Sequence, residues 1–230
     1  LGVQALNRRE CDALRVDGRE LRCKVLVEGG NLGCTQLGRI EFAQAGGRIC
    51  TDAIDNSAGV ETSDHEVNIK ILLGLAVGDG ELTGKQRNAL LAEMTDDVAA
   101  LVLRDNYFQT QVLSVTGRIA PELLDAQQRF VQYLEKEGRL HRAIEFLPSD
   151  GEFARRRTSR QGLASPEAAV LLAYAKMWLF DELVASSLPD DPWVASAIAR
   201  YFPRALTERY ASYMARHPLR REIIATHVAN

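Results

Sequence analysis

The residues from 23 to 51 read CKVLVEGGNLGCTQLGRIEFAQAGGRICT, and this stretch decides the predicted fold of the first third of the chain. Two short apolar runs, 23–27 and 46–51, are bounded by turn residues, a pattern typical of buried parallel strands. The residues between them, 35–45, have the length and apolar spacing of a helix. Strand, helix and strand within about 30 residues make a βαβ unit, which is right-handed in nearly all proteins.

The remainder of the chain is predicted to be helical, because helix-start signals recur along it. An N-cap Ser, Thr or Asp, a Gln three residues after the cap, and a proline in the first turn all favour the start of a helix. Such signals occur at Thr83–Gln86, Pro121, Ser165–Pro166, Asp191–Pro192 and Pro203. We therefore predict an α/β region followed by an all-α region. The boundary is placed near 77–80, because glycine is dense before it and all seven prolines follow it.

Composition excludes several classes of protein. The 230 residues fit one large domain or two modest ones, and 46% hydrophobic with 26% charged residues is ordinary for a folded chain. The net charge of -3 gives no reason to expect nucleic acid as a partner. No apolar run approaches the roughly 20 residues that span a bilayer, so no membrane is expected. Because the chain begins at Leu1 without an initiator Met, we expect a piece of a longer polypeptide.

The four cysteines all lie in the first quarter of the chain, at Cys11, Cys23, Cys34 and Cys50. They form no CxxC pair, and no histidine stands at ligand spacing from them, so the sequence predicts no zinc site. Without a secretory signal, they are expected to be reduced thiols that pack inside a cytoplasmic protein. No other metal site is predicted.

A polar turn follows the first predicted strand. Residues 28–33 read EGGNLG and lie at the carboxyl end of that strand, the edge at which open α/β sheets bind ligands. The adjacent glycines let the backbone approach a ligand, and the amide of Asn31 offers an acceptor and donors. The alternative is a tight turn in which Asn31 caps a helix. The pattern alone leaves both interpretations open.

A second polar segment, 52–60, follows the second predicted strand, and a helical pattern begins near Val60. Val60 and Ser63 lie at i and i+3 and therefore share one face of that helix. The hydroxyl of Ser63, one turn inside the positive end of the helix, can hold a substrate carboxylate. The alternative is that Ser63 bonds the preceding turn and that Asp55 or Asn56 is a helix cap.

The adjacent residues Ser63, Asp64 and His65 do not form a catalytic triad with one another, because consecutive helical residues point about 100° apart. His65 can still act as an acid or base toward another group, but it is interpreted as a surface or interface histidine. The run Arg155–Arg157 is interpreted as a solvated or phosphate-facing group of charges. Aromatic residues at helical spacing are interpreted as core, namely Trp178, Trp193, Tyr201 and Phe202.

With these residues in view, the chain resembles the large bacterial NAD-specific glutamate dehydrogenases. The resemblance is carried by VEGGNLGCTQ at 27–36 and by DNSAGV and SDHEVNIK within 55–70. It continues in the helical part with LRDNY at 103–107, EFLPSD at 145–150, LLAYAK at 171–176 and LRREIIAT at 219–226. The match covers nearly the whole chain.

The resemblance implies specific roles for five residues. Gly30, Asn31 and Asn56 would bind the cofactor NAD, with Asn31 near the ribose or pyrophosphate and Asn56 near the nicotinamide. Val60 and Ser63 would contact the substrate, Ser63 through a hydrogen bond to the distal carboxylate. Smaller glutamate dehydrogenases carry the patterns EGAN and NAGGV, so Gly30 stands in place of their Ala, and Ala58 stands in place of a Gly.

The resemblance also implies the activity and the fold. Residues 1–78 would be the C-terminal half of a Rossmann-like NAD-binding domain, a partial parallel sheet unit, and 79–230 a larger C-terminal helical domain. The parent reaction would oxidise L-glutamate to 2-oxoglutarate and ammonia, with hydride passing to NAD. The family's catalytic Lys and Asp are absent here, so no catalytic residue is assigned. A homo-oligomer is expected.

Two alternatives stay open. The chain can instead be a helical regulatory or oligomerisation module of a large amino-acid dehydrogenase, because long helices often build interfaces. It can also belong to a related dehydrogenase with another side-chain preference, although a hydroxyl at Ser63 favours a carboxylate over an apolar substrate.

Overall fold

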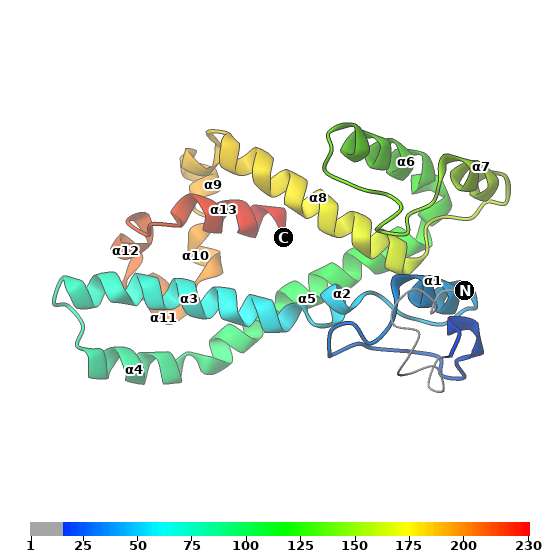
Figure 1. The fold of residues 1–230 in the computed structure, drawn as a ribbon. Helices are drawn as coiled ribbons and strands as arrows, with labels where there is room; N and C mark the ends of the chain where they lie inside the picture. Colours follow the sequence, from blue (N-terminus) through cyan, green and yellow to red (C-terminus); the bar gives the residue numbers. More distant parts are fainter. Residues whose placement is uncertain (1–15) are drawn as a thin grey trace. The chain divides into compact units, whose positions relative to one another are not determined.

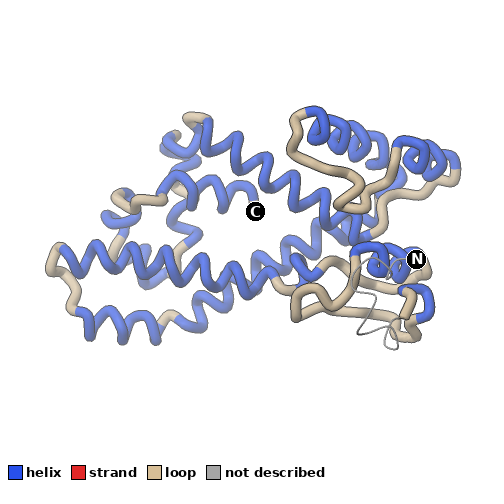
Figure 2. The backbone as a smooth tube through the Cα atoms, viewed as in Figure 1, coloured by secondary structure: helices blue, strands red, loops and turns tan. Residues whose placement is uncertain are grey.

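A computed structural model describes residues 16–230, and the regular elements of this part are all helices, apart from one isolated bridge (Figures 1 and 2). None of the described helices is long and apolar enough to cross a membrane. Cys11 lies outside the described residues. The elements are η2 (Gly18–Glu20), α1 (Gln36–Gln44), α2 (Asp52–Asp55), α3 (Ser57–Gly78), α4 (Gly84–Glu93), α5 (Thr95–Arg118), α6 (Ala120–Lys136), α7 (Asp150–Thr158), α8 (Ser165–Ala185), η3 (Leu188–Asp190), α9 (Pro192–Ala195), α10 (Ile198–Tyr201), α11 (Arg204–Arg209), α12 (Ala211–Ala215) and α13 (Arg220–Ala229).

The predicted α/β region is wrong, because the partial Rossmann-like parallel sheet does not form within the described residues. The two apolar runs meet only at one isolated parallel bridge between Val25 and Arg48. Around it, the Leu26 amide donates to the Arg48 carbonyl at 3.0 Å. A parallel sheet needs covering layers on both faces, but Val25 and Val27 are 56% and 70% exposed. Without further strands beside them, the runs stay extended, and the described fold is all-α.

The helix between these runs is confirmed. Helix α1 begins after Thr35, whose hydroxyl accepts a hydrogen bond from the Gly38 amide at 3.1 Å, and it ends at Ala45. Its Phe42 side chain is 2% exposed and packs against the backbone of Gly47. A Cβ at Gly47 would lie 2.3 Å from the Phe42 ring, so only glycine permits this close return of the chain.

The helix-start signals in the second part are also confirmed. The capping box of Thr83 and Gln86 opens α4, and Asp191 caps α9 by accepting hydrogen bonds from two backbone amides. Pro121 stands in the first turn of α6. The apolar period after Thr83 is shared by two helices, because α4 ends at Glu93 and α5 begins two residues later. Local capping chemistry therefore determined these boundaries.

The described residues form two compact units. The first comprises the residues up to Asn56 together with Gln109–Tyr174, and the second comprises Ser57–Phe108 together with Ala175–Asn230. The domain division at residue 78 stays a prediction.

In the second unit, α3 lies beside α4 (Figure 1) and supplies buried side chains to the largest apolar core. Ile69, Leu72 and Leu73 of α3 are all 2% exposed or less. They pack with residues of α4 and of the C-terminal helices, among them Leu90, Met94, Ile198, Leu206, Met214 and Ile224. Helix α3 is therefore the central element of this unit.

The aromatic residues are core only in part. Tyr201 and Phe202 are 4% and 3% exposed, whereas Trp193 is 84% exposed. The short helices α9 and α10 interrupt the helical spacing that Trp193 shares with the others in the sequence, so the aromatic side chains do not face one side.

The arginine run 155–157 is not simply solvated, because its middle member is buried in the first unit. Arg156 is 5% exposed and donates to both carboxylate oxygens of Glu167, at 2.6 and 2.9 Å. It also donates to Glu152 at 2.8 Å. Since Glu152 and Arg156 belong to α7 and Glu167 to α8, the charges join these two helices.

This network predicts an acid-dependent loss of stability. Hydrogen bonds from Arg155, and from Arg156 despite partial burial, lower the pKa of Glu152 from 4.5 to about 2. A carboxylate with a lowered folded-state pKa stabilises the fold above the unfolded-state pKa and loses that contribution as the pH falls toward the folded-state value. We expect the difference in melting temperature between the wild type and Glu152→Gln to shrink as the pH falls from about 4.5 toward 2.

Glu137→Gln provides the control, since Glu137 is an exposed carboxylate that forms no ion pair among the described residues. Thermal unfolding followed by circular dichroism measures both differences. A Glu152→Gln difference that is constant over this pH range would contradict the prediction.

Candidate functional site

The turn after Val27 is built around a buried carboxylate. Glu28 is 5% exposed, and its two oxygens accept hydrogen bonds from Nε and Nη2 of Arg39 at 2.6 and 3.0 Å. This bidentate geometry is the strong form of a carboxylate–guanidinium pair. Because Arg39 belongs to α1, the pair holds the turn against that helix.

Further hydrogen bonds close the turn. The Cys34 amide donates to Glu28 at 2.8 Å, and the Glu28 amide donates to Asp55 at 2.9 Å. Asp52 accepts from the Leu32 amide at 2.9 Å and lies 3.2 Å from Arg39. Asp52 and Asp55 belong to α2, so the two polar segments that the sequence predicted separately are joined by charge.

The structure brings two of the predicted site residues together. The amide of Asn56 donates to the carbonyl oxygen of Asn31 at 3.0 Å; Asn31 is exposed and Asn56 is half-buried. An amide side chain has two N–H donors and one acceptor oxygen, so this single bond leaves donors on both residues for a ligand. Beside them, a Cβ at Gly30 would meet nothing within 4 Å, so the backbone there is open to close approach.

The helix-cap alternative holds for Asn56 but not for Asn31 or Asp55. Asn56 is the C-cap residue of α2, where its backbone amide donates to the Asp52 carbonyl, and Ser57 begins α3. The N-cap of α1 is Thr35 rather than Asn31. The carboxylate of Asp55 accepts from Glu28 rather than capping α3. The short helix α2 was not predicted from the sequence, although Thr51 at its N-cap position is a residue type that favours the start of a helix.

Val60 and Ser63 lie on α3, which belongs to the second unit. Val60 is 75% exposed, and Ser63 is exposed one turn later. The hydroxyl of Ser63 donates to the Gly59 carbonyl at 3.1 Å, the arrangement expected if Ser63 bonds the preceding turn. Binding a carboxylate would require this hydroxyl to rotate. Both residues are exposed on the solvent side of the first turns of α3.

His65 is buried, so its interpretation as a surface or interface histidine is wrong. Its side chain is 2% exposed and its ring stacks on Tyr201 at 4.4 Å between centroids. The Tyr201 hydroxyl in turn donates to Asp64 at 2.6 Å and accepts from Asn68 at 2.8 Å. Tyr201 arrives from α10, far along the sequence, which explains why local spacing did not predict the burial.

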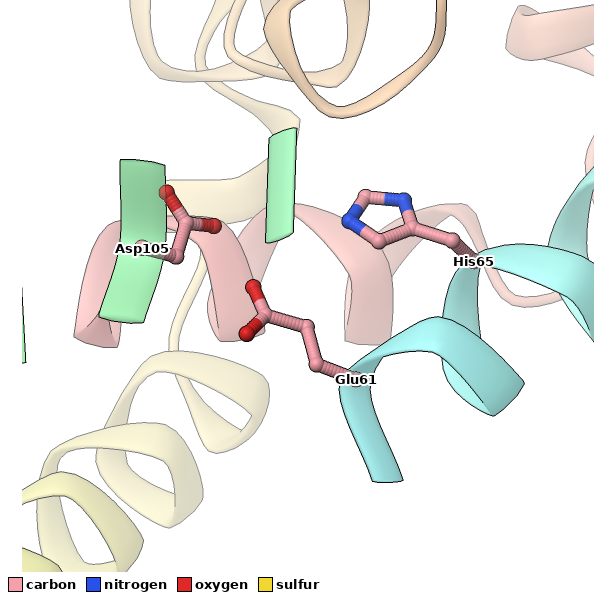
Figure 3. Close-up of side chains that lie close together, drawn as sticks. All are labelled: Glu61, His65 and Asp105. Carbon is pink, nitrogen blue, oxygen red and sulfur yellow. The ribbon is translucent and has the colours of Figure 1, made fainter. Parts of the chain in front are cut away.

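A buried cluster of titratable groups surrounds His65. Glu61 and His65 are one turn apart on α3, and Asp105 comes from α5; Figure 3 shows the three side chains converging. One nitrogen or oxygen atom of each lies within 4.8 Å of the others. The i, i+4 spacing of Glu61 and His65 is visible in the sequence. Their proximity to Asp105 cannot be seen in the sequence, because it depends on the packing of two helices.

The environment of the cluster shifts its pKa values. Burial, then the hydrogen bond and charge of Asp105, raises the pKa of Glu61 to about 8. Burial lowers the pKa of His65 and of the nearby Lys176. Burial acts to raise the pKa of Asp105, but hydrogen bonds from Arg104 and Glu61 lower it. Glu61 is therefore the carboxyl group of the pair that holds a proton more readily, and Asp105 is the one that ionises more readily.

Two family models match the chain. The family described as "Bacterial NAD-glutamate dehydrogenase, catalytic domain" matches residues 3–116, and the family described as "Glutamate dehydrogenase, C-terminal" matches residues 160–230. Together they define the class of the chain, which is part of a dehydrogenase and comprises catalytic-domain and C-terminal sequence.

Curated relatives give the particular family. The chain is 53% identical over 219 residues to proteins named NAD-specific glutamate dehydrogenase from Halomonas elongata and Pseudomonas aeruginosa, and 48% identical over 222 residues to one from Mycobacterium tuberculosis. The matches cover 95%, 95% and 96% of this chain. The chain belongs to the family of large bacterial NAD-specific glutamate dehydrogenases and spans 14% of the length of these relatives.

The buried pair of Glu28 and Arg39 predicts a large stability effect. Removing one partner leaves an uncompensated buried charge, which costs about 3–5 kcal/mol. We expect Arg39→Met to lower the free energy of unfolding by this amount, measured by urea denaturation. Arg19→Met is the matched control, because Arg19 is 64% exposed in its ion pair with Glu41 and such pairs contribute less than about 1 kcal/mol. Equal losses in the two variants would contradict the prediction.

Proposed function

We propose that this chain carries cofactor- and substrate-contacting residues of an enzyme that oxidises L-glutamate to 2-oxoglutarate and ammonia with NAD. The observation that carries the proposal is the pairing of Asn31 and Asn56 at a turn held by buried charges, in a chain of this family. The resemblance to this family implies a cofactor role for both residues. The catalytic acid–base groups of the reaction are not assigned to this chain.

The residues at the turn fit a dinucleotide. The amides of the exposed Asn31 and the half-buried Asn56 offer neutral donors and acceptors suited to ribose hydroxyls, pyrophosphate oxygens and a carboxamide. The open space at Gly30 gives a ligand access to the backbone. NAD supplies the hydride acceptor when bound, and these residues position it. In this proposal Gly30, Asn31 and Asn56 bind the cofactor.

The proposed substrate contacts lie on the first turns of α3. The hydroxyl of Ser63 would rotate from the Gly59 carbonyl to donate a hydrogen bond to the distal carboxylate of glutamate. The apolar side chain of Val60, one turn before it, would line the substrate side chain. A hydroxyl next to an aliphatic group suits a substrate with a short apolar chain that ends in a carboxylate.

The setting of the whole enzyme is part of the same proposal. We propose a cytoplasmic homo-oligomer in which residues 1–78 complete an NAD-binding domain and 79–230 form a C-terminal helical domain. Sequence composition and the family relationship support it.

The cofactor role predicts a change in the requirement for NAD. In the full-length parent enzyme, Asn31→Ala and Asn56→Ala should each raise the KM for NAD by about 3- to 10-fold, the effect of losing one hydrogen bond. Steady-state NADH formation measures it. Asn88→Ala on α4 is the control, because Asn88 is exposed, as Asn31 is, but contacts only Arg87 among the described residues. An unchanged KM in both variants would remove the pair from the cofactor site.

The substrate role predicts a separate change. Ser63→Ala in the full-length enzyme should raise the KM for glutamate by roughly 10- to 100-fold, because a hydrogen bond to a charged group is lost. The KM for NAD should stay the same. Thr62→Ala is a matched control, since the Thr62 hydroxyl also bonds a backbone carbonyl one turn earlier, at 2.7 Å. Unchanged glutamate kinetics in Ser63→Ala would exclude Ser63 from the substrate site.

A second candidate function is a helical regulatory or assembly module, and one observation favours it. Within the second unit, helix α5 exposes the large apolar side chains Leu103, Tyr107 and Phe108. Each of them is 50% exposed or more. Sedimentation velocity of the 230-residue chain, with and without Leu103→Glu, tests this role. Self-association that the substitution abolishes would support it, and a strictly monomeric wild type would argue against it.

A further inference from the structure

The cluster of Glu61, His65 and Asp105 has the composition of a metal-binding site. It brings one imidazole and two carboxyl groups from two facing helices to within 4.8 Å of one another (Figure 3). Helix bundles build metal sites in this way, from side chains that project between neighbouring helices. Glu61 and His65 stand at i and i+4, so both project from the same face of α3.

Two atoms of the cluster lack the hydrogen bonds that buried polar atoms normally have. Oε1 of Glu61 and Nδ1 of His65 are fully buried and have no hydrogen-bond partner among the described residues. His65 is 2% exposed, and Figure 3 shows the ring directed toward the two carboxyl groups. A buried polar group without a partner costs about 1–3 kcal/mol, so such atoms call for an explanation.

The rest of the neighbourhood does not supply the missing partners. The Asp64 carboxylate accepts from Tyr201 at 2.6 Å, and the Asn68 amide donates to the same hydroxyl. The other buried histidine of this unit, His217, uses both ring nitrogens, one with the Asn68 carbonyl and one with the Leu219 amide, each at 3.1 Å. Unlike the two ring nitrogens of His217, Nδ1 of His65 lacks a partner, and an external ligand would provide one.

We propose that Glu61, His65 and Asp105 bind one divalent transition-metal ion of the zinc type, with a fourth position left for water or another ligand. One imidazole nitrogen with two carboxylate oxygens is a donor set for such ions, whereas magnesium and calcium prefer oxygen alone. Bonds of about 2.0–2.2 Å in a tetrahedral site place ligand atoms about 3.4 Å apart. Side-chain rotations that draw the three groups inward by about 1 Å would complete the site.

Two positive groups act against the metal and limit its affinity. Arg104 donates to one oxygen of Asp105 at 2.9 Å, which leaves the other oxygen for the metal. The half-buried Lys176 acts electrostatically on both Glu61 and Asp105. These cations already interact with the carboxyl groups in the metal-free chain, and a metal ion must compete with them. Removing the Lys176 charge is therefore expected to strengthen binding.

A bound ion would join α3 to α5 inside the second unit. Glu61 lies between Val60 and Ser63, so the ion would hold the first turns of the helix that carries them. This makes the proposed role structural, and binding can be measured without any enzyme activity. Failure of the proposed glutamate dehydrogenase function would leave the metal proposal intact.

Cobalt(II) titration of the 230-residue chain, with its thiols blocked by alkylation, tests the proposal. We expect one equivalent of Co²⁺ to bind, to give the visible absorption of a four-coordinate ion, and to raise the melting temperature. Zn²⁺ should displace it. Glu61→Gln, His65→Ala and Asp105→Asn should each weaken binding at least about tenfold, and Lys176→Met should tighten it. His141→Ala is the control, because His141 is exposed and should not affect binding.

Several results would overturn the proposal. If the wild type binds no stoichiometric ion, the proposal is overturned, whatever the variants show. Binding that survives in Glu61→Gln and Asp105→Asn, which keep the side-chain shapes and are checked for folding by circular dichroism, would also refute it. The proposal would also be refuted if the unalkylated protein showed a sulfur-to-cobalt charge-transfer band and lost cobalt binding on alkylation of its thiols. The cysteines would then be the ligands.

Discussion

The buried ion pair of Glu28 and Arg39 is the constraint on which the first unit depends. A carboxylate that is 5% exposed must be neutralised inside the protein, and the guanidinium of α1 reaches it with two hydrogen bonds. Asp52 of α2 contacts the same guanidinium. One set of charges therefore fixes the turn, α1 and α2 together. The exposed contact between Asn31 and Asn56 follows from this arrangement rather than producing it.

Local signals predicted the helices well, and long-range packing explains what could not be predicted. The start of α1 at Thr35 and the capping box at Thr83 depend on side chains within three residues of the backbone groups they satisfy. The parallel strands failed because a strand needs neighbours, and the apolar character of Val25 does not say whether another strand covers it. Likewise, the burial of His65 depends on Tyr201, which is distant in sequence.

The two groups of candidate site residues differ in physical character. The pair of Asn31 and Asn56 is neutral, with Asn31 exposed and Asn56 half-buried, which suits the recognition of a ligand that arrives from solvent. The cluster of Glu61, His65 and Asp105 is ionisable and mostly buried, which suits an ion or proton held within the fold. The family resemblance implies a role for the first group and assigns none to the second. The second was found from geometry, and the i, i+4 spacing on α3 is its sole trace in the sequence.

The division of the described residues into two units has a practical consequence for spectroscopy. The protein contains two tryptophans, and both, Trp178 and Trp193, lie in the second unit. Trp193 is 84% exposed, whereas Trp178 is partly buried. Intrinsic tryptophan emission therefore reports on the second unit alone, because the first unit contains no tryptophan. Comparing this emission with far-ultraviolet ellipticity, to which all the helices contribute, separates the unfolding of the two units without any label.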